Sequence, residues 1–205
     1  MTKAQTGDKS PATPEISAEN LASSARRVAG RGPAPVHLWD PPFCGDLDIR
    51  IARDGTWFYL GTPIGRPELV RLFASILKRE GDAYFLVTPV EKVAIRVDDA
   101  PFVAVDFEPT GQGREQLLTF ETNLGELVQA GPEHPLRFIR DPDSGEPSPY
   151  VMVRADLEAL IDRKSFYRLV ELGVHEEHEG ERRFGLWTDG AFFPIIPSAE
   201  LEAAG

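Results

Sequence analysis

The chain has 205 residues, of which 41% are hydrophobic and 27% are charged, and its formal net charge is -11. This balance is typical of a folded globular protein, and the length suits one large domain or two small ones. The negative charge argues against duplex nucleic acid and anionic membranes as partners, although a local arginine cluster can still hold a small anion.

The cysteine count and the motifs of the chain indicate its compartment and whether it binds a known cofactor. Cys44 is the single cysteine, which excludes an intramolecular disulfide and fits a reducing compartment. No run of about 18 apolar residues occurs, and the first residues lack the apolar stretch of a secretory signal. We therefore expect a cytoplasmic protein. The chain has no Walker or dinucleotide glycine motif, and we expect no cofactor.

The first 35 residues are rich in Ala, Ser, Thr, Pro and Gly and contain no aromatic residue. This composition predicts a flexible, solvated arm. A short helix from Ile16 to Val28 is compatible with the pattern, with Ser17 as its N-cap. Arg26, Arg27 and Arg31 form the basic cluster of the arm.

Residues 36–130 are predicted to form a first α+β half. Leu47, Ile49 and Ile51 alternate with polar residues, which indicates a half-buried strand. Asp54-Gly55 predicts a tight hairpin with a return strand over 56–60. Pro67 suits the first turn of a helix. The apolar stripe of this helix is expected at Leu69, Val70, Phe73, Ile76 and Leu77, with the end at Gly81.

Further strands are expected in the first half over 83–87, 92–97, 102–107 and 117–121. Residues 131–205 are predicted to form a second half of the same kind, with strands over 136–139 and 150–154. Asp156 is expected to cap a helix with an apolar stripe at Leu157, Leu160 and Ile161. A second helical turn over 165–172 ends at Gly173. A terminal meander follows over 175–177, 183–188 and 191–196.

Repeated motifs suggest that the two halves are related. Thr62-Pro63 and Thr88-Pro89 each follow a strand pattern, and proline ends a strand because it cannot donate to the sheet. The two strand ends could therefore frame one site. Asp189-Gly190 echoes Asp54-Gly55. We predict an α+β protein with a duplicated core of antiparallel strands and one main helix per half, divided near Gln129–Glu133.

Several runs of the chain resemble the bacterial domain-of-unknown-function family numbered 1285. They include His37-Leu38-Trp39-Asp40-Pro41-Pro42, Arg53-Asp54-Gly55-Thr56-Trp57, Gly61-Thr62-Pro63-Ile64-Gly65-Arg66, Val87-Thr88-Pro89-Val90-Glu91-Lys92 and Phe120-Glu121-Thr122-Asn123. The resemblance covers roughly residues 37–172. It implies a two-part fold with a duplicated core and a C-terminal part similar to pleckstrin-homology-like domains. It also implies a ligand site between the parts, a nucleotide-like ligand and a role in signalling.

Arginines and aromatic residues of the first half are the leading ligand candidates. Arg50, Arg53 and Arg66 could hold a phosphate or carboxylate by paired hydrogen bonds, with Arg66 placed beside the free N–H groups of a helix start. Trp57 and Tyr59 share one face of the return strand and could stack on a base. The alternative is that the arginines form ion pairs and the aromatic rings are buried.

Polar residues near the two Thr-Pro motifs complete the predicted site. Thr62, Thr88, Glu91 and Lys92 could bind a ribose or a base edge, although surface ion pairs explain the charged ones equally well. Asn123 lies in a predicted turn, and Tyr150 is the candidate from the second half.

Catalytic and metal sites have weaker support. A thiol nucleophile at Cys44 would need a nearby base such as His37, and no nucleophile signature surrounds it. His175 and His178 would point to opposite faces of a strand, which disfavours chelation. We therefore expect a regulatory protein rather than an enzyme, binding a small nucleotide-like anion between its halves. The alternative is a protein–protein interaction module without a small-molecule ligand.

Overall fold

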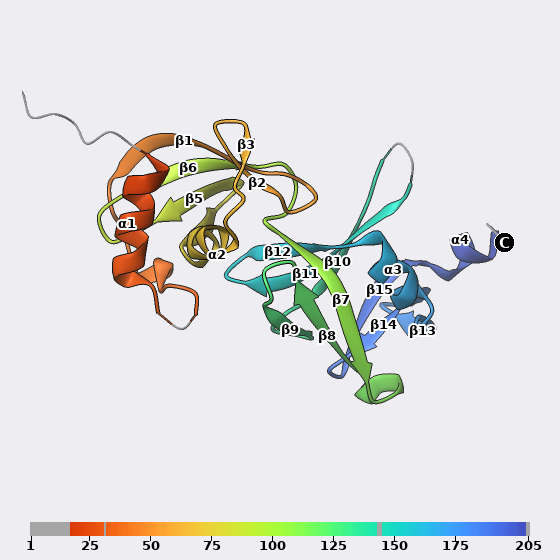
Figure 1. Cartoon of the computed structure of the whole chain (residues 1–205). Coiled ribbons are helices and arrows are strands. Elements are labelled where there is room, and N and C mark those ends of the chain that lie inside the picture. Colours follow the sequence, from red (N-terminus) through yellow and green to blue (C-terminus); the bar gives the residue numbers. More distant parts are fainter. Residues whose placement is uncertain (1–16, 31, 143–144, 204–205) are drawn as a thin grey trace, which may run out of the picture.

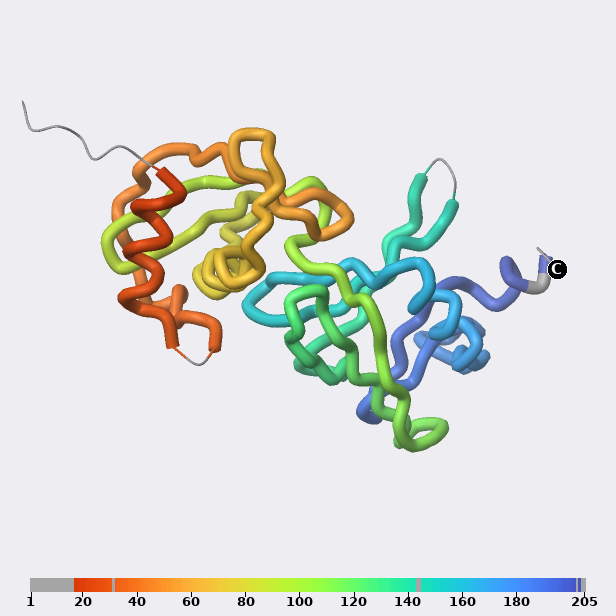
Figure 2. Tube along the Cα trace, viewed as in Figure 1, coloured from red at the N-terminus to blue at the C-terminus, as the bar shows by residue number. Residues whose placement is uncertain are grey.

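The computed structural model describes residues 17–30, 32–142 and 145–203, which form two halves side by side (Figures 1 and 2). No helix in this described part of the chain is long and apolar enough to cross a membrane. The elements of the first half are α1 (Ala18–Val28), η1 (Val36–Leu38), β1 (Phe43–Ile51), β2 (Trp57–Tyr59), β3 (Thr62–Pro63), α2 (Pro67–Ser75), β4 (Leu77–Glu80), β5 (Ala83–Val87) and β6 (Lys92–Val97).

The first half is built on a six-stranded sheet in the order β3-β2-β1-β6-β5-β4. Two antiparallel meanders, β1 to β3 and β4 to β6, meet at a parallel pair of β1 with β6. The predicted alternation in β1 is confirmed, since Leu47, Ile49 and Ile51 are buried. The Asp54-Gly55 turn is confirmed as well: the Thr56 N–H donates to Asp54 Oδ1 at 2.9 Å, and Gly55 has a φ of 82°.

Two helices pack together in the first half. α2 covers the core through Phe73, and α1 packs beside α2 (Figure 1). Ser17 caps α1 as expected, because its hydroxyl oxygen accepts from the Asn20 N–H at 3.3 Å. Leu21 and Ala25 of α1 are buried, so the prediction of a solvated arm is wrong for this helix. The remainder of the expected arm at residues 1–16, together with Arg31, lies outside the described residues.

The second half contains another six-stranded sheet, in the order β10-β11-β12-β7-β8-β9. Antiparallel meanders again meet at one parallel pair, here β12 with β7. Its elements are β7 (Phe102–Thr110), η2 (Gly113–Glu115), β8 (Leu117–Thr122), β9 (Leu127–Ala130), β10 (Leu136–Arg140), β11 (Pro147–Arg154), β12 (Leu157–Ile161) and α3 (Arg163–Val170).

The chain follows the same path through both sheets. It runs outward from the centre to one edge, crosses over, and returns from the opposite edge to the centre. The predicted α+β class and duplicated core are thereby confirmed. The helices are placed differently, since α2 forms the crossover of the first half whereas α3 follows the last strand of the second sheet. The likeness of the second half to pleckstrin-homology-like domains stays a prediction.

The division between the halves differs from the expected one. β6 ends in the first sheet at Val97 and β7 begins in the second at Phe102, whereas the sequence placed the division near Gln129–Glu133. In the sequence, β7, β8 and β9 follow β6 after short turns, so they were assigned to the first half. β7 also pairs with β12, which begins at Leu157, 27 residues after β9 ends at Ala130, and no local signal reveals that partner.

Two helix predictions were wrong in part. α2 ends at Ser75, and Leu77–Glu80 forms β4 because these residues pair with β5. Leu157–Ile161 is a strand rather than a helix. It lies centrally between β11 and β7 and is buried on both faces, and periodicity cannot distinguish such a short, largely apolar segment from a helix. The predicted helix over 165–172 corresponds to α3, capped by Asp162, whose Oδ1 accepts from the Ser165 N–H at 2.7 Å.

A third sheet completes the second half and confirms the predicted terminal meander. Three antiparallel strands and a short helix follow α3 along the chain: β13 (Val174–His178), β14 (Glu181–Thr188), β15 (Ala191–Pro197) and α4 (Ser198–Ala203). The Thr188 hydroxyl joins this sheet to the second one, because it donates to the Ala130 carbonyl at 2.8 Å and accepts from the Leu118 N–H at 3.1 Å.

Candidate functional site

Side chains from both halves cross the junction between them. Asn123 and Arg154 of the second half donate to the carbonyls of Gly55 at 3.4 Å and Ala74 at 3.0 Å. Arg53 and Arg79 of the first half donate to Ser148 Oγ and to the Asp156 carbonyl, both at 3.4 Å. The two halves are therefore fixed to one another by polar contacts at several points.

Asp99 lies in the segment that connects the two sheets and binds both sides of the junction. Tyr150 donates from its hydroxyl to Asp99 Oδ1 at 2.8 Å, and the Arg53 guanidinium lies 3.3 Å from Oδ2. That second oxygen is buried, and no donor among the described residues reaches it in hydrogen-bond geometry. Burial, reinforced by the bond to Asp99, raises the pKa of Tyr150 to about 12.

The Tyr150 phenol predicts a specific loss of stability at alkaline pH. Its pKa is higher in the folded chain than its ordinary value of 10.0, so its contribution is present below pH 10 and is lost as pH rises towards about 12. We expect the Tyr150→Phe variant to lose less unfolding free energy between pH 9 and 11 than the natural chain, as measured by urea unfolding. Equal losses in the two proteins would contradict this role of Tyr150.

A groove of about 530 Å³ lies next to this cluster. Arg53 is the lining residue from the first half, and the remaining lining residues come from the second half. They are Asp141, Glu146, Pro147, Ser148, Pro149, Leu160, Ile161, Asp162, Arg163, Phe166 and Tyr167. Its volume falls in the range of about 300–1,000 Å³ that is usual for small-molecule sites.

The groove has a mixed chemical lining. Arg53 and Arg163 supply two guanidinium groups, and Tyr167 presents a ring that is 60% exposed. Arg163 lies 6.0 Å from the centre of that ring. Carboxylates also line the groove, and the one on Asp162 already accepts from the Ser165 N–H. This set can pair with an anion, stack on a planar ring, and accept hydrogen bonds from hydroxyl or amino groups.

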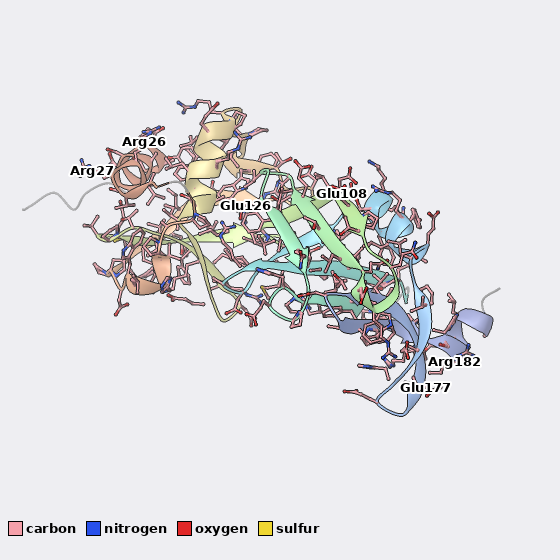
Figure 3. The ribbon with its side chains drawn as sticks, turned by 90° about the horizontal axis from the view of Figure 1, so that it is seen from below. Arg26, Arg27, Glu108, Glu126, Glu177 and Arg182 are labelled. Carbon is pink, nitrogen blue, oxygen red and sulfur yellow. The ribbon has the colours of Figure 1, made fainter. Side chains whose placement is uncertain are left out.

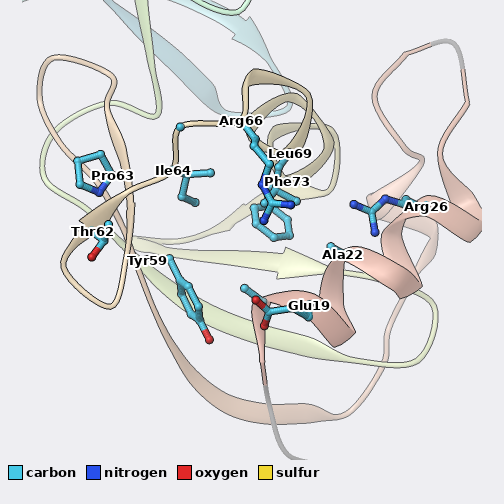
Figure 4. Close-up of a pocket in the computed structure, with 12 residues that line it drawn as sticks. Glu19, Ala22, Arg26, Tyr59, Thr62, Pro63, Ile64, Arg66, Leu69 and Phe73 are labelled. Carbon is cyan, nitrogen blue, oxygen red and sulfur yellow. The ribbon is translucent and has the colours of Figure 1, made fainter.

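A second pocket, of about 390 Å³, lies in the first half beneath α1 (Figure 4). It contains three of the predicted site residues, Tyr59, Thr62 and Arg66. The expected row of free helix N–H groups beside Arg66 is absent. Pro67 has no N–H, and the Leu69 and Val70 N–H groups donate to the Arg66 carbonyl. Any anion recognition in this pocket must therefore come from side chains.

Other predicted residues have structural contacts away from both pockets. Arg50 pairs with Asp98 at 2.8 Å and lies 4.7 Å from the centre of the Phe58 ring. Lys92 pairs with Glu80 at 3.0 Å. Thr88 is buried, and its hydroxyl accepts from the backbone N–H groups of Val90 and Glu91, which closes the turn between β5 and β6.

The two Thr-Pro motifs do not meet. Thr62 lies on the edge strand β3, and Thr88 follows β5 on the other side of the sheet, with β2, β1 and β6 between them. Trp57 is 2% exposed and stacks on Phe73, so its ring is out of reach of a ligand. Asn123 also has a structural role, because its Oδ1 accepts from the Val103 N–H at 3.1 Å while its amide holds Gly55.

The structure gives no support to a thiol or metal site in the part of the chain it describes. Cys44 is exposed, and its Sγ donates to the Pro42 carbonyl at 3.4 Å. His175 lies on β13, where its Nδ1 is 2.7 Å from Ser198 Oγ. Within the described ranges, no group of three or more His, Cys, Asp or Glu side chains is placed to hold a metal ion.

Comparison with known families matches both halves in turn. Residues 34–100 match the domain of unknown function DUF1285, N-terminal domain, and residues 101–195 match the C-terminal domain of the same family. The chain belongs to the DUF1285 family. The family's internal boundary coincides with the change of sheet between β6 and β7.

The solved structure of a similar DUF1285 protein agrees with this assignment. The crystal structure of a DUF1285 protein from Silicibacter pomeroyi DSS-3 is 65% identical and superposes with a TM-score of 0.82, covering 89% of this chain and 97% of that one. One from Shewanella baltica OS155 is 35% identical, with a TM-score of 0.48, and covers 61% of this chain and 91% of that one. No match was found among curated proteins.

Sequence reasoning missed the residues that line the groove opposite Arg53. Arg163 and Tyr167 lie on α3, whose start was expected at 165. Their spacing of four residues puts both on one face of a helix, and this signal was present in the sequence. Arg26 was assigned to a solvated arm, although the helical pattern around it was recognised.

Proposed function

We propose that this DUF1285 protein is a regulatory protein that binds a small nucleotide-like ligand in the groove between its two halves. One observation carries the proposal: Arg53 of the first half and Ser148 of the second line this groove side by side, and the Arg53 guanidinium donates to Ser148 Oγ at 3.4 Å. A ligand in the groove would contact both halves at once. Because polar side-chain contacts of this kind cross the junction, ligand binding would change how firmly the halves are joined.

The mixed lining favours a nucleotide-like molecule over a simple inorganic anion. Arg53 and Arg163 suit a phosphate, and the exposed face of Tyr167 suits a base. The carboxylates of the groove would repel a highly charged anion but accept hydrogen bonds from a ribose or an amino group. A ligand with one phosphate and several hydrogen-bond donors satisfies both conditions.

A regulatory output would pass through Asp99. Arg53 touches the groove on one side and Asp99 on the other, and Asp99 holds Tyr150 of β11. A phosphate that draws Arg53 into the groove would weaken its ion pair with Asp99. The connecting segment between the sheets would then be less constrained, and ligand binding would be transmitted to both halves through it.

A thermal-shift screen against nucleotides, cyclic nucleotides and dinucleotides tests the proposal. A ligand at about 100 times its dissociation constant adds about 2.7 kcal/mol, a rise of several degrees for a chain of this size. We expect the thermal shift to be lost in Arg163→Gln. Lys164→Gln is the control and should keep the shift, because Lys164 is the next residue along the chain and does not line the groove. A flat panel, or a shift that survives Arg163→Gln, would overturn the proposed site.

A protein–protein interaction module is the second candidate, and an exposed apolar surface favours it. Phe43 is 57% exposed and Val90 is 67% exposed. They lie at the same end of the first sheet, because Phe43 pairs with Lys92 just after Val90. If nucleotides give no shift, a partner that co-purifies with the natural chain and is lost in Phe43→Ser would support this function instead.

A further inference from the structure

The pocket beneath α1 is separate from the groove and has walls from three elements. Ala18, Glu19, Ala22 and Arg26 come from α1, the β2–β3 hairpin supplies Tyr59, Thr62 and Pro63, and the start of α2 supplies Arg66, Leu69 and Phe73. Figure 4 shows these side chains around one space. The α1 wall lies before residue 34, outside the segments that match the family models.

Two guanidinium groups enter this pocket from facing helices without a partner. Most arginines of this acidic chain form ion pairs, at Arg50, Arg53, Arg79, Arg114, Arg137, Arg140, Arg154, Arg168 and Arg183. Arg26 and Arg66 have neither an ion pair nor a side-chain hydrogen bond among the described residues. Both side chains line the pocket, and an anion held there could accept hydrogen bonds from both.

The remaining lining defines the rest of the ligand. Phe73 is fully buried at the base of the pocket, and Ile64 and Leu69 add aliphatic surface beside it. The half-buried ring of Tyr59 forms a further wall. Glu19 brings one negative charge to the same pocket, which disfavours a ligand with several anionic groups. The lining therefore selects an apolar body with a single negative charge.

We propose that this pocket binds a small amphipathic monocarboxylate, with its carboxylate between Arg26 and Arg66 and an aromatic or branched aliphatic body over Ile64 and Leu69. The helix N-terminus contributes little, because Pro67 lacks an N–H and the Leu69 and Val70 N–H groups donate to the Arg66 carbonyl. Recognition rests on the two guanidinium groups. Since one of them belongs to α1, the bound carboxylate fastens α1 to α2.

Calorimetric titration with hydrocinnamate, with isocaproate as an aliphatic probe, tests this site. We expect either Arg26→Gln or Arg66→Gln to weaken binding about tenfold or more, because each removes a charge-assisted hydrogen bond. Arg27→Gln is the matched control: Arg27 is the next residue on α1 (Figure 3) and does not line the pocket. The neutral hydrocinnamide should bind much more weakly than the acid.

Hydrogen exchange supplies a second readout that separates this pocket from the groove. The bound probe should slow exchange of the α1 amides at Leu21, Ala22 and Ala25, and Arg163→Gln should leave this protection unchanged. Absence of binding by both probes, equal binding of the amide, or equal affinity in Arg26→Gln and Arg27→Gln would overturn the proposal. None of these results depends on whether a nucleotide binds between the halves.

Discussion

Replacing Arg137 with Met is expected to destabilise the protein by about 3–5 kcal/mol, because it leaves a buried carboxylate without its partner. Glu158 is 8% exposed, and both of its oxygens accept from Arg137, at 2.7 and 2.5 Å. The hydrogen bonds to Glu158 raise the pKa of Arg137. Urea unfolding followed by circular dichroism measures the loss.

The double variant Arg137→Met, Glu158→Met provides the control for this prediction. It removes both charges, so no isolated carboxylate remains, and we expect it to be clearly more stable than Arg137→Met alone. Arg137 also lies 4.7 Å from the centre of the Tyr150 ring, and the Met side chain retains part of that contact. A single variant that loses less than about 1 kcal/mol, the scale of a surface pair, would contradict a buried role for Glu158.

Truncating Trp57 to Ala is expected to cost a similar amount, about 3–5 kcal/mol, because it opens a cavity in the first core. The indole ring is 2% exposed and stacks on Phe73, with ring centroids 6.4 Å apart and an interplanar angle of 22°. The loss should appear as a lower urea midpoint with an unchanged slope.

Phe58→Ala is the matched control for Trp57→Ala. Phe58 is the next residue on β2, half-buried on the opposite face beneath Arg50. We expect a distinctly smaller loss from this truncation. If Phe58→Ala destabilised the protein as much as Trp57→Ala, the assignment of the two faces of β2 would be wrong.

Trp57 shows what local sequence patterns can and cannot predict. The sequence placed it correctly on a return strand after the Asp54-Gly55 turn, and it indicated that one strand face is core. It could not tell which face, because Trp57 and Phe58 are both large and aromatic. The answer depends on α2, whose Phe73 lies over Trp57. Hairpins, caps and the start of α2 were predictable because their signals are local.

The features that were missed depend on contacts between distant residues. Leu157–Ile161 became a strand because β11 and β7 flank it, and β4 formed because β5 offers it a pairing edge. The boundary between the halves is set by the parallel pairing of β7 with β12, and no sequence motif predicts this pairing. Tertiary pairing of this kind overrides helical spacing in short apolar runs.

The candidate site was the least predictable feature. Arg53 was predicted as a ligand contact at a hairpin end, and its structural partners, Asp99 and Ser148, are far away in the sequence. Arginines that look alike in sequence have different roles. Arg50 is neutralised by Asp98, whereas Arg66 has no ion-pair partner among the described residues and faces a pocket. Only the folded chain distinguishes paired from unpaired arginines in a protein with this excess of acidic residues.

The most direct test of a nucleotide-like ligand between the halves is hydrogen exchange with and without the nucleotide that gives the largest thermal shift. We expect slower exchange at the groove, at the Ser148 and Tyr150 amides and in the first turn of α3, with no comparable change in α1. Protection confined to α1 and the β2–β3 hairpin, or no protection anywhere, would contradict it.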